Sequence, residues 1–328
     1  MDITLRGLET SDIPAWNRLL ADVEKVDRTG EHYNEADLAE EMANPDIVPE
    51  RDIVGAFEGD DLVGYFAVYA RAATEEYLKI GMEGAVRPDR RGRGIGTTLA
   101  DAMRRRALEV HREKHPELPV MLTLRGLADN EEQQQLMADI GLVPERWNFG
   151  MRADLSQEAR TPAIVPEGLE LRRYDESVAE AMHAAHNAAF VDHPNWTPWS
   201  DSEWKQWVTE SRNFRPHLSF VVVDQAQPDE VVAYLQTNEY DAYFTATGRR
   251  EAYVGKVGTL REYRGRGIAS TLLGHCLHAY RDAGYDEASL DVDSENPTGA
   301  LGVYRRAGFE VETRRTDYAL TVEPGGLR

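Results

Sequence analysis

The chain has 328 residues, 41% of them hydrophobic, and a formal net charge of -21 at pH 7. Its length fits about two domains, and its acidity argues against nonspecific nucleic-acid binding, which relies on Lys and Arg to neutralise phosphates. No apolar run is long enough to cross a bilayer, the start lacks the pattern of a secretion signal, and Cys276 is the single cysteine. We therefore expect a cytoplasmic protein without disulfides and without nucleic-acid or membrane partners.

Taken in chain order, the first half alternates strand and helix patterns. Residues 3–20 are typical of a short strand, a turn and a helix with an acidic first turn, and residues 52–70 of two strands joined by a Gly-Asp turn. A strand at 79–86 precedes a glycine-rich loop and an amphipathic helix. A strand at 121–125, a helix that ends before Gly141 and a last strand complete this half.

The second half repeats this order after a linker. Residues 156–167 contain two prolines and no periodic apolar pattern, which predicts a linker between a first domain at 1–155 and a second at 168–328. In the second domain, residues 219–240 predict a hairpin with a longer turn, and residues 252–260 the strand before the second glycine-rich loop. Each half reads β-α-α-β-β-β-α-β-α-β, so the sequence predicts an α/β fold with a mixed sheet in each of two tandem domains.

A basic glycine-rich motif occurs in each half between a strand and a helix. The shared pattern R-G-R-G-I-[GA]-[ST]-T-L begins at Arg91 and at Arg264. The helix start offers unpaired N–H groups and a positive dipole end, glycines let a ligand approach the backbone, and arginines add forked donors. The motif therefore predicts two pyrophosphate cradles. The candidate residues are Val86, Arg91, Gly92, Arg93, Gly94, Ile95, Gly96 and Thr97 in the first copy and Arg264, Gly265, Arg266, Gly267, Ile268, Ala269 and Ser270 in the second.

The arrangement of these motifs resembles a known family. The pattern R-x-x-G-x-[GA] between a strand and a helix is similar to the acyl-CoA loop of the GCN5-related N-acetyltransferase (GNAT) superfamily. The second copy continues the likeness with Leu290–Val292, Asn296 and the run Ala300–Phe309. The resemblance covers nearly the whole chain. Tandem members of the superfamily include mycothiol synthases and some antibiotic acetyltransferases.

The resemblance implies an enzyme that transfers acetyl from acetyl-CoA to a primary amine of a small molecule. Tyr304 stands at the family's proton-donor position, four residues before Gly308, and would protonate the departing thiolate. The strand end at Thr259 and Leu260 would supply the backbone donor for the oxyanion, and Asn296 would orient the pantetheine arm or the helix of the acid. Other interpretations remain open: acetylation of a cysteinyl amine as in mycothiol synthases, a cationic antibiotic as acceptor, or acyl-CoA binding without turnover. Both a monomer and a homodimer fit.

The first copy differs from the second at the proton-donor position. Met137 stands four residues before Gly141, and its thioether sulfur has no proton to donate. We therefore expect the first domain to bind acetyl-CoA but to be inactive or slow, and the second to carry the chemistry. The alternative, in which the first domain is active without a tyrosine acid, stays open because geometry and water can replace a positioned acid.

The general base is harder to place in the second copy. Glu251, at the start of the strand before the loop, is the expected base, and Glu239 and Asp241 are alternatives. Each is also explained as an exposed acid at a strand end. Lys256 lies inside that strand, where some relatives carry an acid.

Tryptophans are frequent in residues 193–208, which in the family form a wall of the acceptor cleft. Trp196 and Trp199 fit either an aromatic pocket for a cationic amine or the core, whereas Trp204 and Trp207, three residues apart, are expected to pack in the core. We expect no metal site, because the pair of histidines at 111 and 115 lacks a third ligand.

Overall fold

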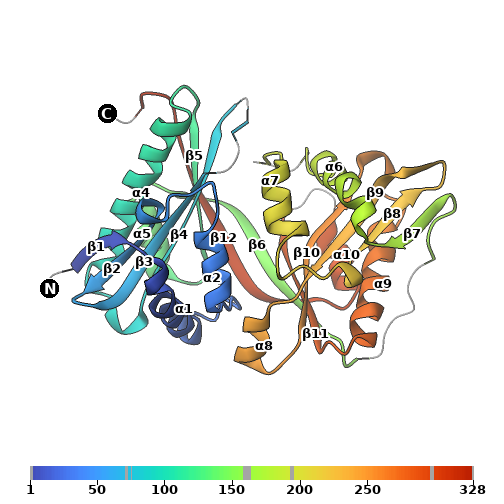
Figure 1. The fold of residues 1–328 in the computed structure, drawn as a ribbon, viewed down its shortest axis with the longest axis horizontal. Coiled ribbons are helices and arrows are strands. Elements are labelled where there is room, and N and C mark those ends of the chain that lie inside the picture. Colours follow the sequence, from blue (N-terminus) through green and yellow to red (C-terminus); the bar gives the residue numbers. More distant parts are fainter. Residues whose placement is uncertain are drawn as a thin grey trace. The chain divides into compact units, whose positions relative to one another are not determined.

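The structure, a computed structural model, describes residues 3–70, 73–74, 76–157, 164–192, 196–295 and 299–326. It divides into two compact units, unit 1 formed by Met1–Trp147 with Arg314–Arg328 and unit 2 formed by Asn148–Thr313. Each unit is a mixed α/β domain, and the predicted fold class is therefore confirmed (Figure 1).

In unit 1 the strands lie in the order β1-β2-β3-β4-β5-β12, with β4 and β5 parallel and the other neighbours antiparallel. The elements of this unit are β1 (Ile3–Gly7), η1 (Thr10–Asp12), α1 (Ile13–Asp27), α2 (Glu35–Met42), α3 (Pro49–Asp52), β2 (Ile53–Glu58), β3 (Asp61–Ala70), β4 (Leu78–Val86), η2 (Pro88–Arg90), α4 (Ile95–Lys114), β5 (Val120–Leu127), α5 (Glu131–Asp139) and β12 (Glu310–Val322).

In unit 2 the order is β6-β11-β10-β9-β8-β7, with β10 and β11 parallel. Its elements are β6 (Val143–Asp154), β7 (Leu169–Arg173), η3 (Glu176–Val178), α6 (Ala179–Ala189), α7 (Asp201–Trp204), a π-helical turn (Lys205–Thr209), η5 (Pro216–Leu218), β8 (Phe220–Asp224), β9 (Gln227–Asn238), α8 (Asp241–Thr247), β10 (Glu251–Thr259), η6 (Arg261–Tyr263), α9 (Ile268–Asp282), β11 (Glu287–Asp293) and α10 (Ala300–Arg306).

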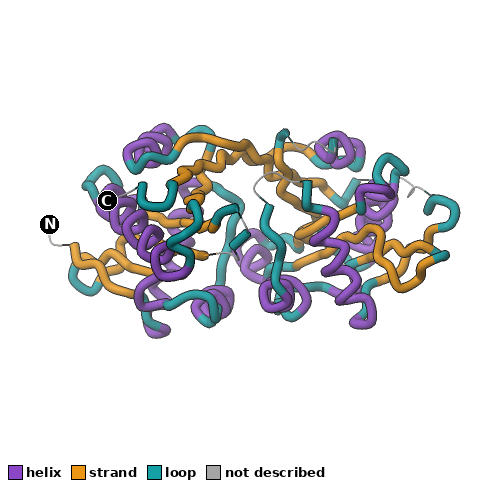
Figure 2. Tube along the Cα trace, turned by 90° about the horizontal axis from the view of Figure 1, so that it is seen from above, coloured by secondary structure: helices purple, strands orange, loops and turns teal. Residues whose placement is uncertain are grey.

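Within each unit, helices lie on both faces of the sheet (Figure 2). In unit 1 the β3 strand buries side chains on both faces, which explains its nearly continuous apolar sequence. Val63 and Val68 face the core that α4 covers, whereas Tyr65 and Ala67 face the core that α1 and α2 cover. Residue Trp16 of α1 is fully buried in the latter core. The site is built on these two faces of β3 and its neighbour β4.

The last strand of each sequence half completes the sheet of the other unit. Strand β12 pairs with β5 from Arg315↔Leu127 to Val322↔Val120, and β6 pairs with β11 from Glu287↔Asp154 to Asp293↔Asn148. The units therefore differ from the predicted domains 1–155 and 168–328. The physical reason is that an antiparallel edge accepts any strand of matching alternation, so sequence order does not fix the partner.

Two local expectations for unit 2 also change. The turn between β8 and β9 has two residues, Gln225 and Ala226, and is not the longer turn predicted. Register shifts near Val222 and Val223 accommodate the extra residues of the strands. Helix α8, which the sequence analysis did not predict, follows the hairpin and begins at Asp241.

The parallel ladders end before their strands do. The β4–β5 ladder runs from Leu78↔Val120 to Met82↔Leu124, although β4 continues to Val86. The β10–β11 ladder runs from Glu251↔Glu287 to Tyr253↔Ser289, although β10 continues to Thr259. The last residues of β4 and β10 therefore extend past their parallel partners, toward the glycine-rich loops.

Two kinds of feature are absent from the described part of the chain. No helix there is long and apolar enough to cross a membrane. No group of three or more His, Cys, Asp and Glu side chains in those residues is arranged to hold a metal ion.

The exchanged strands make a prediction about truncated chains. Residues 1–155 alone lack β12, and residues 168–328 alone lack β6, so each fragment would expose the unpaired edge of β5 or β11. We expect each fragment to be largely insoluble on its own and the two to co-purify when expressed together. The measurement is soluble yield and pull-down of a tag on one fragment. A stable, monomeric 1–155 fragment would contradict the assigned pairing.

Candidate functional site

Both glycine-rich loops have the backbone of an anion cradle. Gly92 and Gly94 have φ of +71° and +80°, in the left-handed region that favours glycine, and Gly265 and Gly267 repeat this with +76° and +78°. Gly94 and Gly267 are the N-caps of α4 and α9. The N–H groups of the next three residues in each helix precede its first i→i−4 hydrogen bond and point out of the helix end, where they suit a phosphate.

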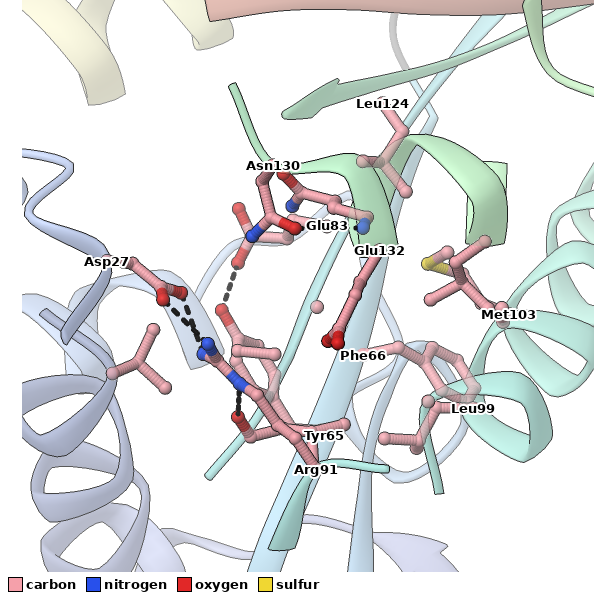
Figure 3. Close-up of a pocket in the computed structure, with 18 of the residues that line it drawn as sticks. Asp27, Tyr65, Phe66, Glu83, Arg91, Leu99, Met103, Leu124, Asn130 and Glu132 are labelled. Carbon is pink, nitrogen blue, oxygen red and sulfur yellow. Dashed lines mark hydrogen bonds and ion pairs between the residues drawn. The ribbon is translucent and has the colours of Figure 1, made fainter. Parts of the chain in front are cut away.

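The first arginine of each motif anchors the loop. Arg91 makes two hydrogen bonds of 2.7 Å to the Asp27 carboxylate at the end of α1 and donates from Nε to the Val86 carbonyl at 3.1 Å. Its forked donors, which the sequence analysis assigned to a pyrophosphate, are engaged with a carboxylate instead (Figure 3).

Arg264 anchors the second loop in the same way. It donates to the Asp192 carboxylate at 3.0 Å, to the Ala189 carbonyl at the end of α6 at 2.7 Å, and to the Thr259 carbonyl at 3.2 Å. In both copies the arginine therefore joins the end of a strand to the end of a helix. Its contribution to a ligand site is the shape of the loop.

The loop of unit 1 opens onto a cleft of about 390 Å³. Its lining includes six of the predicted residues of the first copy: Val86, Arg91, Gly92, Gly94, Gly96 and Thr97. Ile95 is buried in the core, and Arg93 is exposed, so neither lines the cleft. Asn130 lines it too, and its side chain caps α5 by accepting from the Gln133 N–H at 3.0 Å.

The loop of unit 2 opens onto a pocket of about 460 Å³. Leu260 does not line it. The Leu260 N–H donates to the Val232 carbonyl at 2.9 Å and is therefore not available to an oxyanion. Arg266 does not line it either, and its guanidinium lies over the Tyr263 ring. Asn296 lies outside the described residues. The predicted residues in the lining are Thr259, Arg264, Gly265, Gly267, Ile268, Ala269, Ser270 and Tyr304.

A carboxylate that the sequence analysis missed lies in the cleft of unit 1. Glu83 is the first residue of β4 beyond the end of the parallel ladder, and it lines the cleft together with the glycine-rich loop. Tyr65 of β3 donates from its hydroxyl to Glu83 Oε1 at 2.9 Å (Figure 3). Burial raises the pKa of Glu83 to about 7.

Further acids and tyrosines surround Glu83. The Tyr33 hydroxyl donates to Glu31 at 3.3 Å, and both residues line the cleft. The Tyr69 hydroxyl donates to Glu41 of α2. Burial and the charge of Glu83 raise the pKa of Glu41 well above its usual value. The lining of the cleft therefore brings the acids Glu31 and Glu83 close to the phenol groups of Tyr33 and Tyr65.

An internal alignment would have located Glu83. Glu83 and Lys256 each lie eight residues before the first arginine of their motif, Arg91 or Arg264. The two glycine-rich motifs fix the alignment of the copies, and this alignment places an acid in the first copy opposite a lysine in the second. The aligned Glu83 points to the first domain, the one in which Met137 replaces the tyrosine.

At that position unit 2 carries a cation. The Lys256 ammonium lies 4.2 Å from the centre of the Trp199 ring. The nearby His186 shares a 2.6 Å hydrogen bond with the Tyr234 hydroxyl. Burial, with the charge of Lys256 adding to it, lowers the pKa of His186 to about 3, so this imidazole is neutral near pH 7 and is a poor base.

The two copies also differ at the proton-donor position. Tyr304 lines the pocket of unit 2, and burial raises its pKa to about 12. Met137, its counterpart, lines the cleft of unit 1 and packs in the core. One copy therefore holds a carboxylate without a tyrosine at these two positions, and the other a tyrosine without a carboxylate.

The acids proposed as base in unit 2 do not line its pocket. Glu251 is buried at the start of β10, where Arg152 Nη1 binds its carboxylate at 2.7 Å. The Glu239 carboxylate is bound by Arg215 at 2.8 Å and by other donors. Asp241 begins α8. Their placement does not support a role in proton transfer at this pocket.

The tryptophans divide between core and surface. Trp204 is buried as expected, but Trp207 is 38% exposed, which corrects the expectation that it packs in the core. The π-helical turn that begins at Lys205 rotates Trp207 out of the face expected for an α-helix. Trp199 packs against the core of unit 2 and against Lys256, and Trp196 is half-buried.

Comparison with known proteins identifies the family. A model of the acetyltransferase (GNAT) family matches residues 16–122 and 179–309. The chain belongs to this family. Mycothiol acetyltransferases of Nocardia farcinica and Rhodococcus erythropolis are each 30% identical to it, over 69% and 77% of this chain and 70% and 79% of their own. The chain is an acyl-CoA-dependent N-acetyltransferase.

Solved structures of the family share the fold. A GCN5-related N-acetyltransferase from Sphaerobacter thermophilus has a TM-score of 0.78 and 25% identity, over 98% of this chain and 96% of that chain. A tandem GNAT protein from the clavulanic acid biosynthesis pathway has a TM-score of 0.72 and 18% identity, over 98% of each chain. The tandem GNAT fold expected from the motifs is thereby confirmed.

Two neighbouring glycines give a test of the cradle backbone. Gly94→Ala places a side chain at φ +80° and should destabilise the chain by about 1 kcal/mol. Gly96→Ala lies within α4, where a Cβ meets Leu136 at an ordinary 3.5 Å, and should stabilise by up to about 1 kcal/mol. Thermal and denaturant unfolding measure both. Equal effects of the two changes would contradict the described loop.

Proposed function

We propose that the chain transfers acetyl from acetyl-CoA to a primary amine of a small molecule, and that the transfer takes place in the cleft of unit 1. The observation that carries the proposal is the position of Glu83. Its carboxylate lies in the same cleft as the cradle of Gly92 and Gly94. An amine must lose a proton before it attacks a thioester, and a carboxylate with a pKa of about 7 is suited to take it near neutral pH.

The proton balance does not require a tyrosine in this cleft. An ammonium gives one proton to Glu83, and the amine nitrogen then attacks the thioester carbon to form the C–N bond of a tetrahedral intermediate. The C–S bond breaks when this intermediate collapses. The nitrogen of the tetrahedral intermediate carries one proton too many, and this proton passes to the departing sulfur. Met137 donates no proton. The products are an amide, coenzyme A and a protonated Glu83, which releases its proton to water.

The pocket of unit 2 is the second candidate site. It is favoured by Tyr304, which lines the pocket. With its high pKa this phenol holds a proton that it can give to a thiolate. Against this site stand Lys256 in the place of an acid and the ion pair that holds Glu251. In the proposal this pocket binds acyl-CoA and turns it over slowly.

The acceptor is proposed from the acids that line the cleft and from the relatives. The carboxylates of Glu31 and Glu83 suit an amine that arrives as an ammonium. The relatives named mycothiol acetyltransferase favour a cysteinyl amine on a sugar conjugate as the acceptor to test first. Simple primary amines and an aminoglycoside complete a useful panel, because they vary charge and size independently.

Replacing the base distinguishes the two sites. Glu83→Gln keeps the shape of the side chain but accepts no proton at the working pH, so we expect kcat/KM to fall roughly 100-fold or more. Tyr304→Phe, the matched change in the other unit, should leave most of the turnover. The assay is thiol release from acetyl-CoA with the amine panel. The reverse pattern would move the active site to unit 2.

The pKa of Glu83 sets the expected pH dependence. The reaction needs the ionised carboxylate, so kcat/KM should rise about tenfold per pH unit below a pH of about 7 and level off above it. The measurement is a pH profile with two acceptor amines of different pKa. If the acid limb of the profile, where kcat/KM rises with pH, has the same midpoint for both amines, that midpoint reports a pKa of the enzyme. A limb that moves with the amine would instead report ionisation of the acceptor.

A further inference from the structure

We propose that the Tyr65 hydroxyl is a positioning group for Glu83, which it orients in the cleft and keeps ionised for proton transfer. The inference rests on the proposed function, because it assigns a purpose to a neighbour of the proposed base. Tyr65 contacts Glu83 and is not placed in contact with either substrate. It is therefore a positioning residue and not a catalytic one.

The fold directs the two side chains at each other. In the β3–β4 ladder Ala67 is paired with Glu83 and Tyr65 with Ala85, so Tyr65 and Glu83 lie on one face of the sheet as diagonal neighbours. The Tyr65 hydroxyl donates to Glu83 Oε1 at 2.9 Å. This bond occupies one carboxylate oxygen of Glu83 and leaves the other to take the proton of an amine.

The Tyr65 ring is held firmly, so its hydroxyl is placed before any ligand binds. The ring is buried, and its centre lies 5.2 Å from that of Trp16, which is itself fully buried. On the β4 side, Gly84 allows a close approach of the strands, because a Cβ there would lie 2.7 Å from the Tyr65 carbonyl oxygen. The Tyr65 side chain therefore has little room to rotate away and break the hydrogen bond.

The charges around Glu83 show why such a donor is useful. Burial and the carboxylate of Glu31 both raise the pKa of Glu83, whereas the hydrogen bond from Tyr65 lowers it. Glu41 adds a further acid on the α2 side. Arg91, Arg125 and Arg315 each pair with a carboxylate, at 2.7 Å to Asp27, 2.6 Å to Asp317 and 3.6 Å to Glu31. Tyr65 thus opposes an environment that would otherwise favour the protonated base.

The second copy provides an internal control. Tyr234 occupies the position of Tyr65, since Gly258 pairs with it as Ala85 pairs with Tyr65. Its hydroxyl is bonded to His186 of α6 instead of an acid on the adjacent strand. The shared tyrosine is therefore part of the scaffold, and its hydrogen bond to a carboxylate is particular to unit 1.

The test is the pH profile of kcat/KM for the full chain with acetyl-CoA and a fixed amine. Tyr65→Phe removes the donor, so the pKa of Glu83 should rise and the acid limb should move to higher pH by about one unit. Tyr234→Phe, the matched change in unit 2, should leave the limb in place. An unmoved limb in Tyr65→Phe would overturn the proposal.

A second variant tests the same bond without removing it. Replacement of Tyr65 by 3-fluorotyrosine gives a more acidic phenol of nearly the same size, which should strengthen the bond and move the limb to lower pH. Shifts of opposite sign in the two variants support positioning, and shifts of the same sign contradict it. A merely structural role would lower kcat/KM evenly at all pH values.

Failure of the proposed function would be recognised separately. If Glu83→Gln retains turnover, the base lies elsewhere and the function proposed for unit 1 is wrong. If Glu83→Gln abolishes turnover and the limb does not move in Tyr65→Phe, the function stands and the role of Tyr65 is wrong. The two outcomes involve different variants and cannot be confused.

Discussion

The early end of the parallel ladders is the constraint on which both sites depend. In unit 1 the ladder stops at Met82↔Leu124, and in unit 2 at Tyr253↔Ser289. Parallel strands that stay paired leave no room between them, whereas strands that separate expose the edge of one of them. The exposed end of β4 carries Glu83 and leads into the glycine-rich loop. A carboxylate and a phosphate cradle therefore reach one cleft without any side chain bridging a long distance.

The loop and the strand are held in this arrangement by a cation whose hydrogen bonds go to the protein itself. Arg91 and Arg264 each join a strand-end carbonyl to the end of a helix, in both cases with a carboxylate as a further partner. A half-buried guanidinium with several acceptors is well satisfied. The phosphate is then left to backbone N–H groups and the helix dipole. Because the arginine shapes the loop and the backbone N–H groups suit the phosphate, the arginine is useful in both copies. It recurs although the copies differ at Glu83 and Lys256.

Much of the fold was predictable, because strand and helix patterns depend on local periodicity. The strands expected at 79–86 and 252–260 match β4 and β10 within one residue at each end. The exchange of β6 and β12 was not predictable, because an edge strand's alternation fits either sheet. The carboxylate partner of Arg91 was not predictable for a similar reason: a forked donor suits a carboxylate as well as a phosphate. Glu83 was predictable from its alignment with Lys256 in the repeat, whereas its bond to Tyr65 depends on the register of the sheet.

One copy has the carboxylate of Glu83 and the other the phenol of Tyr304, so the copies show which of the two groups matters more for acetyl transfer. The attacking nitrogen arrives with two protons to lose, and a carboxylate removes the first, without which no attack occurs. The second proton is already on the intermediate, beside the sulfur that needs it, so a tyrosine at that place speeds a step that has its own proton source. A copy with Glu83 and Met137 can therefore still complete the transfer, although no tyrosine speeds the protonation of the departing sulfur. A copy with Tyr304 and Lys256 has no carboxylate at this position to accept that first proton. On this argument the loss of an acid from β10 is the more damaging of the two changes.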